Sequence, residues 1–253
     1  MASFRRAVGV AVVAGVLGMG SSAVVADFVP IMDSPGSELD HAEILEGVFS
    51  PGTAWTPFGP RTDTLDRGVD LTNGLLQAVR VDDFGLGGVL NANVATIGDT
   101  DDQRWTGGPV VASAKARYAS YSQQLGYDLH GDKRGYKRLF KVNGSGLNVT
   151  GGGTLELSPG NTWDWVRSGN GGKWYSDPAN NRDGLDHLVT YQLRGTNDDL
   201  NHWLLFWEDL NHLGDQDYND LVVELSTPVP EPGTAVLAGV GFGVLLSLRR
   251  RLS

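Results

Sequence analysis

Two apolar segments near the C-terminal end, Trp203-Leu204-Leu205-Phe206-Trp207 and Leu221-Val222-Val223-Glu224-Leu225, decide the fold of this chain. Both are short and rich in aromatic and β-branched residues, which favour the pleated surface of a sheet. A polar stretch, 208–220, separates them. The pattern predicts two antiparallel strands, His202–Trp207 and Leu221–Leu225, joined as a hairpin.

Similar short apolar runs recur upstream, between clusters of glycine, proline, asparagine and aspartate. They predict further strands at Ile44–Phe49, Leu75–Val81, Val89–Ile97, Val110–Tyr121, Lys137–Val142, Thr154–Leu157, Trp163–Arg167 and Leu188–Leu193. A helical turn is expected at Gln123–Tyr127 or around Ser37–Ala42. Many short strands punctuated by turns are typical of a β-sandwich, so we predict an all-β, sandwich or jelly-roll-like single domain.

The polar loop of the hairpin is rich in side-chain oxygens. Its carboxylates and one amide are Glu208, Asp209, Asp215, Asp217, Asn219 and Asp220. Folding the hairpin brings these groups to one end of two neighbouring strands, where the carboxylates repel one another, and no lysine or arginine lies in the loop. A hard divalent cation would relieve the repulsion, since Ca²⁺ prefers roughly six to eight oxygen ligands. We predict a structural calcium site here; a solvated acidic turn is the alternative.

The order of residues in the loop differs from that of an EF-hand. The stretch Asp215-x-Asp217-x-Asn219 has the alternating spacing of calcium loops, but the sixth position is Asp220 instead of glycine and the twelfth is Ser226 instead of glutamate. The flanking segments also read as strands, not helices. The loop is therefore predicted to bind calcium within a β-hairpin.

The hairpin also resembles a known family. Trp207-Glu208-Asp209, followed by Gly214-Asp215-Gln216-Asp217-Tyr218-Asn219-Asp220, resembles the FED…GGDxDFND signature of an uncharacterised bacterial secreted domain, the domain of unknown function four-one-one-four. Weaker likenesses at Ala116–Tyr121, Leu125–Tyr127 and Asp183–His187 extend the resemblance over Pro109–Ser226. Leu213 stands where the family has a glycine. The resemblance implies a β-sandwich with calcium binding, and it implies no reaction.

Four aromatic residues cluster between glycine-rich turns: Trp163, Trp165, Trp174 and Tyr175. Trp163 and Trp165 share one face of a strand, because side chains alternate with a period of two. Exposed aromatic rings in this arrangement stack on sugars in carbohydrate-binding modules. Burial in the core explains the same residues equally well, since aromatic side chains dominate cores. Both interpretations remain open from the sequence.

The C-terminal tail carries a second resemblance. It reads Val229-Pro230-Glu231-Pro232, then an apolar stretch Ala235–Leu248, then Arg249, Arg250 and Arg251. This order is similar to the PEP-CTERM sorting signal of Gram-negative bacteria. The resemblance implies a membrane-embedded, exosortase-type sorting enzyme as partner, and delivery to the cell surface or extracellular matrix. An ordinary anchor is the alternative, although the apolar transmembrane stretch is shorter than the roughly 20 residues that cross a bilayer.

The N-terminal end agrees with export. Arg5 and Arg6 precede an apolar run, Ala7–Met19, and the small residues Ser21–Ala26 follow, as in a secretory signal peptide. We therefore predict a signal peptide over 1–26 and a sorting tail over 228–253. Between them we expect an N-terminal β part of the sandwich, or an extension, over 27–108, and a β-sandwich domain with the acidic hairpin over 109–227.

Composition limits the function further. The chain has 20 basic and 30 acidic residues, and removing both predicted ends leaves 15 and 29, a net charge of −14. Such a surface repels nucleic acid, so no nucleic-acid partner is expected. The absence of cysteine excludes disulfides and thiolate metal sites. The stability of an exported chain of this kind depends on its core or on bound ions.

The common catalytic motifs are not found in the sequence, which contains no G-x-S-x-G, no P-loop and no dinucleotide fingerprint between a strand and a helix. We therefore expect an exported, non-catalytic structural or adhesive protein stabilised by calcium, with extracellular polysaccharide as a further possible partner. A carbohydrate-binding module is the first alternative. A polysaccharide-acting glycoside hydrolase that uses two of the many carboxylates is the second.

Overall fold

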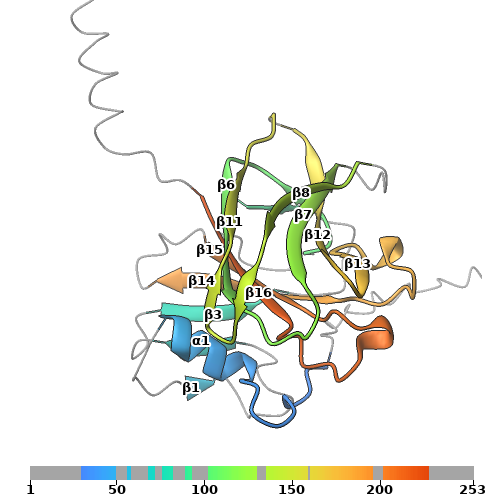
Figure 1. Ribbon diagram of the computed structural model, residues 1–253. Coiled ribbons are helices and arrows are strands. Elements are labelled where there is room, and N and C mark those ends of the chain that lie inside the picture. The colour runs from blue at the N-terminus through green and yellow to red at the C-terminus, as the bar shows by residue number, and fades with distance from the viewer. Residues whose placement is uncertain are drawn as a thin grey trace, which may run out of the picture.

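The computed structural model describes residues 30–49, 56–57, 68–71, 76–81, 89–92, 102–129, 135–158, 160–195 and 202–227. These residues form mostly β-strands with one short α-helix, which confirms the prediction of an all-β fold (Figure 1). The predicted signal peptide and the predicted sorting tail lie outside the described residues. Among the helices of the described ranges, none has the length and apolar character needed to cross a bilayer.

The larger sheet has eight antiparallel strands in the described part of the chain, in the order β1-β2-β3-β14-β15-β16-β6-β11. The strands are β1 (Thr56–Pro57), β2 (Gly68–Leu71), β3 (Leu76–Arg80), β14 (Leu188–Gly195), β15 (His202–Trp207), β16 (Leu221–Ser226), β6 (Val110–Ala116) and β11 (Gly152–Leu155). The predicted hairpin β15–β16 lies in the middle of this sheet. Trp207 pairs with Leu221, so the polar loop 208–220 joins the neighbouring ends of two central strands.

The smaller sheet has six strands in the described residues, in the order β4-β5-β12-β7-β8, and β13 pairs with β12 beyond this path. These strands are β4 (Leu90–Asn91), β5 (Trp105–Thr106), β12 (Thr162–Gly169), β7 (Gln123–Leu129), β8 (Lys137–Lys141) and β13 (Gly172–Tyr175). A short separate hairpin joins β9 (Asn143–Ser145) to β10 (Asn148–Thr150). The two large sheets face one another and enclose the main core.

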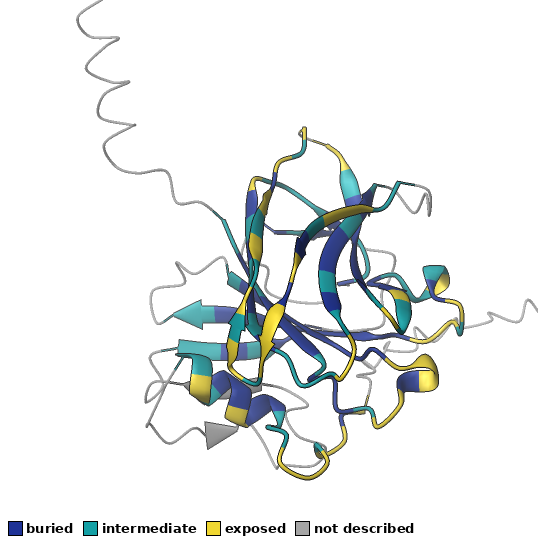
Figure 2. Cartoon of the chain, in the orientation of Figure 1, coloured by how far each residue is buried: buried dark blue, intermediate teal, exposed yellow. Residues whose placement is uncertain are grey.

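Tryptophan fills the core between the sheets. The fully buried tryptophans of the smaller sheet and its neighbours are Trp105, Trp163, Trp165 and Trp174, and those of β15 are Trp203 and Trp207. The rings of Trp105 and Trp203 meet edge to face with centroids 5.5 Å apart, which is a favourable aromatic geometry. Alternate residues of β15 and β16 point into this core, and Figure 2 shows the central strands buried along their length.

The other residues of the central strands form a second core on the outer face of the larger sheet. There Val189, Tyr191 and Phe206 pack with residues of the helix α1 (His41–Phe49), which covers this face (Figure 1). Asp40 and Glu43 begin the helix as a capping box: the Glu43 backbone N–H donates to Asp40 Oδ1 over 2.9 Å, and Glu43 Oε2 accepts from the Asp40 backbone over 3.0 Å. Burial on both faces explains why these strands read as continuous apolar runs.

Two predicted elements are wrong. Ile44–Phe49 was expected as a strand and belongs to α1, because the capping box starts a helix and buries Ala42, Ile44 and Leu45 on one side. Gln123–Tyr127 was expected as a helical turn and lies in β7, where Leu125 is buried in the core between the sheets. The other predicted helical turn, Ser37–Ala42, contains only the first two residues of α1.

Some predicted strands have different ends. Val110–Tyr121 forms a strand only as far as Ala116. The strand expected at Val89–Ile97 is present at Leu90–Asn91, and residues 93–97 lie outside the described ranges. The predicted strand Thr154–Leu157 is displaced toward the N-terminus, as Gly152–Leu155. The described strands before Pro109 belong to the same two sheets as the strands after it. β3 pairs with β14 in the larger sheet, and β5 pairs with β12 in the smaller sheet.

Candidate metal centre

The end of the β15–β16 hairpin sets the positions of its first and last acidic residues. Glu208 follows the last residue of β15, and Asp220 precedes the first residue of β16. The Asp209 backbone N–H donates to Asp220 Oδ2 over 2.7 Å, and the Leu210 N–H donates to Glu208 Oε1 over 2.9 Å. These bonds hold one oxygen of each carboxylate against the loop backbone.

The loop between them is compact. It contains a short 3-10 helix, η3 (Asn211–Leu213), and four non-glycine residues with positive φ: His212, Leu213, Gln216 and Tyr218. Leu213 has a φ of 64° and a buried side chain. Tyr218 is also buried, and its hydroxyl donates to the Asp186 carbonyl over 3.1 Å. Leu213 and Tyr218 thus anchor the loop on the outer core.

The predicted carboxylates come together in two overlapping groups. Glu208, Asp215 and Asp217 offer oxygens within 4.8 Å of one another, and so do Glu208, Asp209 and Asp220. Glu208 is common to both groups. All five carboxylates expected from the sequence are therefore neighbours in the fold.

Burial makes this arrangement electrostatically costly. Glu208 is fully buried and Asp217 is 2% exposed, whereas Asp215 is exposed. Burial, and next the charge of Asp220, raises the pKa of Glu208 well above its ordinary range. Burial, and next the charge of Asp215, raises the pKa of Asp217 to about 6. The folded loop thus disfavours its own negative charges unless a proton or a cation neutralises them.

Three buried oxygens in the loop have no hydrogen-bond partner among the described residues: Glu208 Oε2, Asp217 Oδ2 and Asn219 Oδ1. The orientation of the Asn219 amide follows from its nitrogen, since Nδ2 donates to Ser34 Oγ over 2.9 Å and to the Leu39 carbonyl over 3.1 Å. Buried acceptors without a donor cost free energy. An all-oxygen set of this kind fits a hard cation such as Ca²⁺.

Asp209 differs from the other predicted ligands, because β12 brings a cation to it. Arg167 Nη2 lies 2.7 Å from Asp209 Oδ2, and both residues are buried. Gln123 bridges the pair, donating to Asp209 Oδ2 and accepting from Arg167 Nε. One Asp209 oxygen is therefore already neutralised. The inward position of Arg167 could have been predicted from the sequence. Side chains alternate along a strand, so Arg167 lies on the same face as Trp163 and Trp165.

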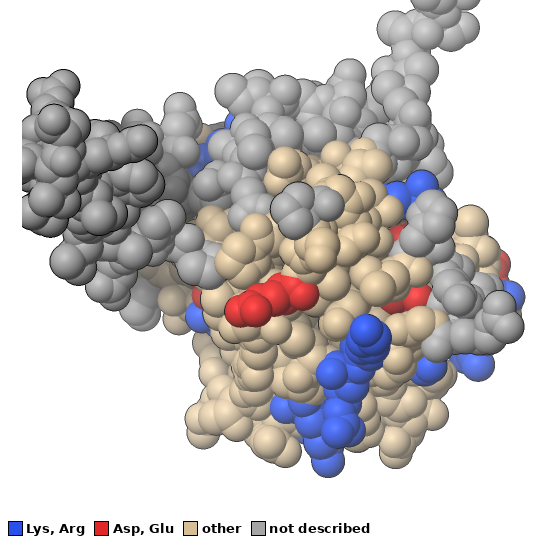
Figure 3. Space-filling view, turned by 90° about the horizontal axis from the view of Figure 1, so that it is seen from above, with Lys and Arg blue, Asp and Glu red and all other residues tan. Residues whose placement is uncertain are grey.

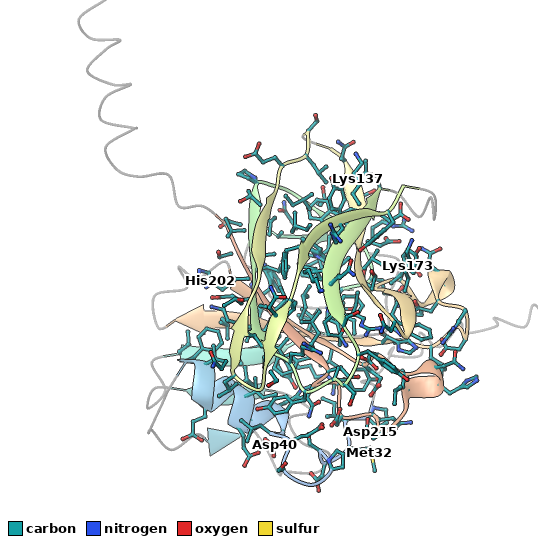
Figure 4. All side chains as sticks on the ribbon, viewed as in Figure 1. Met32, Asp40, Lys137, Lys173, His202 and Asp215 are labelled. Atoms are coloured by element: carbon teal, nitrogen blue, oxygen red, sulfur yellow. The ribbon has the colours of Figure 1, made fainter. Side chains whose placement is uncertain are left out.

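The segment before α1 and the first residue of α1 also support the loop, and sequence reasoning missed both. The Met32 N–H donates to the Gln216 carbonyl over 2.9 Å, and His41 Nε2 lies 2.9 Å from the Asp217 carbonyl. His41 Nδ1 lies 3.0 Å from the Tyr191 hydroxyl. Burial, and next the charge of Arg80, lowers the pKa of His41 to about 3, so its neutral ring donates from Nε2 and accepts at Nδ1. Figure 4 shows Met32 and Asp215 close together at one end of the molecule.

A second histidine supports the loop from the other side. His187 is fully buried, and its ring stacks on that of Trp174 with centroids 3.8 Å apart. Its Nδ1 lies 3.1 Å from the Glu208 carbonyl, and its Nε2 lies 3.1 Å from Asp183 Oδ2. His187 therefore fixes the backbone of Glu208, the residue that both acidic groups share. His187 is part of no metal-binding motif in the sequence. In the fold, its ring nitrogens contact the Glu208 carbonyl and Asp183.

The four aromatic residues that could have formed a sugar-binding surface do not do so. Trp163, Trp165 and Trp174 are fully buried, and Tyr175 is 5% exposed. No face of these rings is open to a sugar, so the prediction of a carbohydrate-binding surface at these positions is wrong. The alternative interpretation, an aromatic core, is confirmed. The inward period of β12 places Trp163 and Trp165 between the sheets, where their rings meet with centroids 5.9 Å apart.

Comparison with known proteins gives one family. Residues 154–227 match the family described as "Domain of unknown function (DUF4114)". No curated protein matches the chain. The match runs from β11 to the residue after β16 and includes the whole acidic loop, whereas the resemblance expected from the sequence began earlier, at Pro109. The part of the chain that carries the candidate metal centre is thus similar to the DUF4114 family.

Proposed function

We propose that this protein is an exported, non-catalytic structural or adhesive β-sandwich whose hairpin loop binds Ca²⁺. The observation that supports the metal is the convergence of buried oxygens without donors on a group of mutually close carboxylates. Glu208 and Asp217 contribute both features. A divalent cation there would neutralise the repulsion and would supply the missing partners at once.

The two groups differ in how well they suit the ion. Glu208, Asp215 and Asp217 form the better set, because Glu208 and Asp217 each have an oxygen without a donor and Asn219 follows two residues later. In the second set Asp209 is paired with Arg167 and Asp220 accepts a backbone hydrogen bond. We therefore assign the ion to the first set, with Asn219 Oδ1 as a fourth ligand. Oxygen donors without sulfur or imidazole favour calcium over zinc or copper.

The proposed location and role rest on the sequence. The signal-like N-terminus and the PEP-CTERM-like tail, with its exosortase-type partner, favour a place at the cell surface or in the extracellular matrix. Extracellular modules typically bind calcium with dissociation constants of roughly 0.1–1 mM, which suits a site with one exposed ligand, Asp215. A cation that closes the hairpin loop would stabilise the large sheet, because β15 and β16 lie at its centre.

A thermal melt of the full-length chain tests the metal. We expect 2 mM Ca²⁺ to raise the midpoint by about 5 °C over a chelator, because an ion that binds only the folded state stabilises it. Asp217→Asn should reduce this gain by at least about half, since it removes charge with little change of shape. Glu156→Gln, an exposed residue beyond β11, is the matched control and should keep the full gain.

Two results would contradict the proposal. One is a wild-type midpoint that is the same in calcium and in chelator. The other is an equal loss of the calcium response in Asp217→Asn and Glu156→Gln, which would move the ion away from the loop.

A further inference from the structure

The smaller sheet carries an exposed basic surface. Lys137, Arg138 and Lys141 of β8 and Lys173 of β13 are all exposed, and we call these four residues the basic stripe. Figure 3 shows Lys and Arg side chains gathered in an elongated band on the face seen from above. In Figure 4, Lys137 and Asp215 lie at opposite ends of the molecule. The basic stripe is therefore separate from the acidic loop.

The register of β8 explains how its charges reach the surface. Arg138 pairs with Gly126 and Lys141 pairs with Gln124, with an irregularity of the ladder between them. Leu125 lies between these two partners and points into the core, so its neighbours on β7 face outward. Arg138 and Lys141 accordingly project from the outer face of the sheet. They are about 10 Å apart along the strand. Lys137, the exposed first residue of β8, pairs with Tyr127, which packs against the core, and so it lies on the other side of the strand.

A tyrosine holds Lys173 near the start of β8. Lys173 Nζ lies 4.3 Å from the centre of the Tyr136 ring, a cation–π contact. The Tyr136 hydroxyl lies 3.0 Å from Ser168 Oγ. The ring also lies on Gly126, where an added Cβ would come within 2.5 Å of it. Tyr136 thus crosses β7 from the start of β8 and positions Lys173 on the same outer face.

No acidic side chain neutralises the basic stripe within the described ranges. None of its four residues forms an ion pair there, whereas Lys115 on the larger sheet is paired with Glu224. The acidic residues that β7 and β12 place side by side on this face, Asp128 and Asp164, are fully buried. Neither of these two aspartates therefore adds exposed negative charge beside the basic stripe, although Figure 3 shows other acidic side chains on the face that carries the basic band. The described residues 135–141 contain three basic residues and no acidic one.

We infer that the basic stripe binds an anionic polysaccharide, a thin chain that carries carboxylates at intervals of one or two sugars. The net charge of the chain is −10, so most of its surface repels polyanions. A nucleic-acid duplex, with a charge about every 1.7 Å, or a flat anionic bilayer would extend past the basic stripe onto the acidic surface. A thin and sparsely charged polymer can contact the stripe alone. The inference does not depend on calcium, because the acidic loop lies at the other end of the molecule.

Binding to hyaluronan, a linear uronic-acid polysaccharide, tests this inference with the full-length chain. We expect binding at 50 mM salt that weakens about tenfold or more at 300 mM, because salt screens exposed charges. Arg138→Gln/Lys141→Gln should weaken binding about tenfold. The matched variant Lys115→Gln/Arg194→Gln removes the same charge from the larger sheet and should stay within about twofold of the wild type.

Neutral dextran, duplex DNA and phosphatidylglycerol vesicles serve as the other ligands, and thermal melts confirm that each variant is folded. Hyaluronan binding that exceeds binding to all three supports the inference. The inference is overturned if the wild type does not bind hyaluronan at 50 mM salt, if the two double variants lose binding equally, or if DNA or vesicles bind more tightly. The hyaluronan assay does not depend on whether calcium raises the thermal midpoint. Each of the two proposals can therefore be overturned without the other.

Discussion

At the scale of single residues, Asp164 is a carboxylate buried at a cost. It is fully buried on β12, its Oδ2 accepts from Asn180 Nδ2 over 2.8 Å, and its Oδ1 has no partner among the described residues. Burial, and next the charge of Asp177, raises the pKa of Asp164 to about 6, and Asp128 adds to the rise while Arg104 opposes it. The folded protein therefore binds a proton at Asp164 more tightly than the unfolded chain does.

This preference predicts a pH-dependent gain for Asp164→Asn. Because the folded pKa lies above the ordinary value of 3.8, the cost of the charge is absent below about pH 4, grows between pH 4 and 6, and is complete above pH 6. Asp164→Asn should thus raise the free energy of unfolding by about 1–2 kcal/mol at pH 7.5 and change it little at pH 4. Urea unfolding at both pH values measures the effect. A variant that is less stable than the wild type at pH 7.5 would show that the charge is needed.

At the scale of elements, α1 and the segment before it form one unit with the hairpin loop. His41 joins the helix to the Asp217 carbonyl and to Tyr191, and its ring lies on that of Phe206 with centroids 4.1 Å apart. Asn219 is joined to Ser34 and Leu39 of the same segment. The loop backbone therefore depends on residues that come at the beginning of the described chain.

Replacing His41 tests this dependence. His41→Ala should lower the free energy of unfolding by about 2–4 kcal/mol, because it opens a cavity and leaves the Asp217 carbonyl without its donor. The calcium-dependent gain in thermal midpoint should fall as well. Glu46→Ala on the same helix is the control, and it should change both quantities little. Should His41→Ala keep the full calcium gain while losing stability, the helix would support the sheet and not the loop.

The hairpin was predictable from the sequence, whereas the residues that support its loop were not. The β15–β16 hairpin and its five close carboxylates were predictable, because two apolar runs and the polar stretch between them lie together within residues 202–226. The partners of the loop were not, since Arg167 lies 42 residues before Asp209 and His41 lies 176 residues before Asp217. The helix α1 was missed because its apolar residues Ile44, Leu45 and Val48 suit a strand as well as a helix. The capping box of Asp40 and Glu43 was the signal that distinguishes them.

At the scale of the whole molecule, one buried ion pair connects the two sheets. Arg167 belongs to β12 of the smaller sheet, and Asp209 follows β15 of the larger one. Trp174 of β13 adds a second connection, since its Nε1 donates to the Asp209 carbonyl over 2.7 Å. The position of the sheets relative to one another is thus held by polar bonds next to the tryptophan core.

Removing the arginine tests this connection. Arg167→Met should lower the free energy of unfolding by about 3–5 kcal/mol in chelator, because it leaves Asp209 buried without its partner. Arg167→Met/Asp209→Leu should recover part of this loss. Arg104→Met, whose pair with Asp177 is more exposed, should cost less than about 1 kcal/mol. Urea unfolding compares the three, and a similar cost for Arg104→Met and Arg167→Met would disprove the special role of the buried pair.

The central position of β16 also bears on mechanical load. This last described strand is bonded on one side to β15 and on the other to β6, both antiparallel, so its backbone is held along two ladders. A pull transmitted through Thr227 along the axis of β16 must shear both ladders together; it cannot unzip one bond at a time. Tension from that end of the chain would therefore meet high resistance at the strand that receives it first.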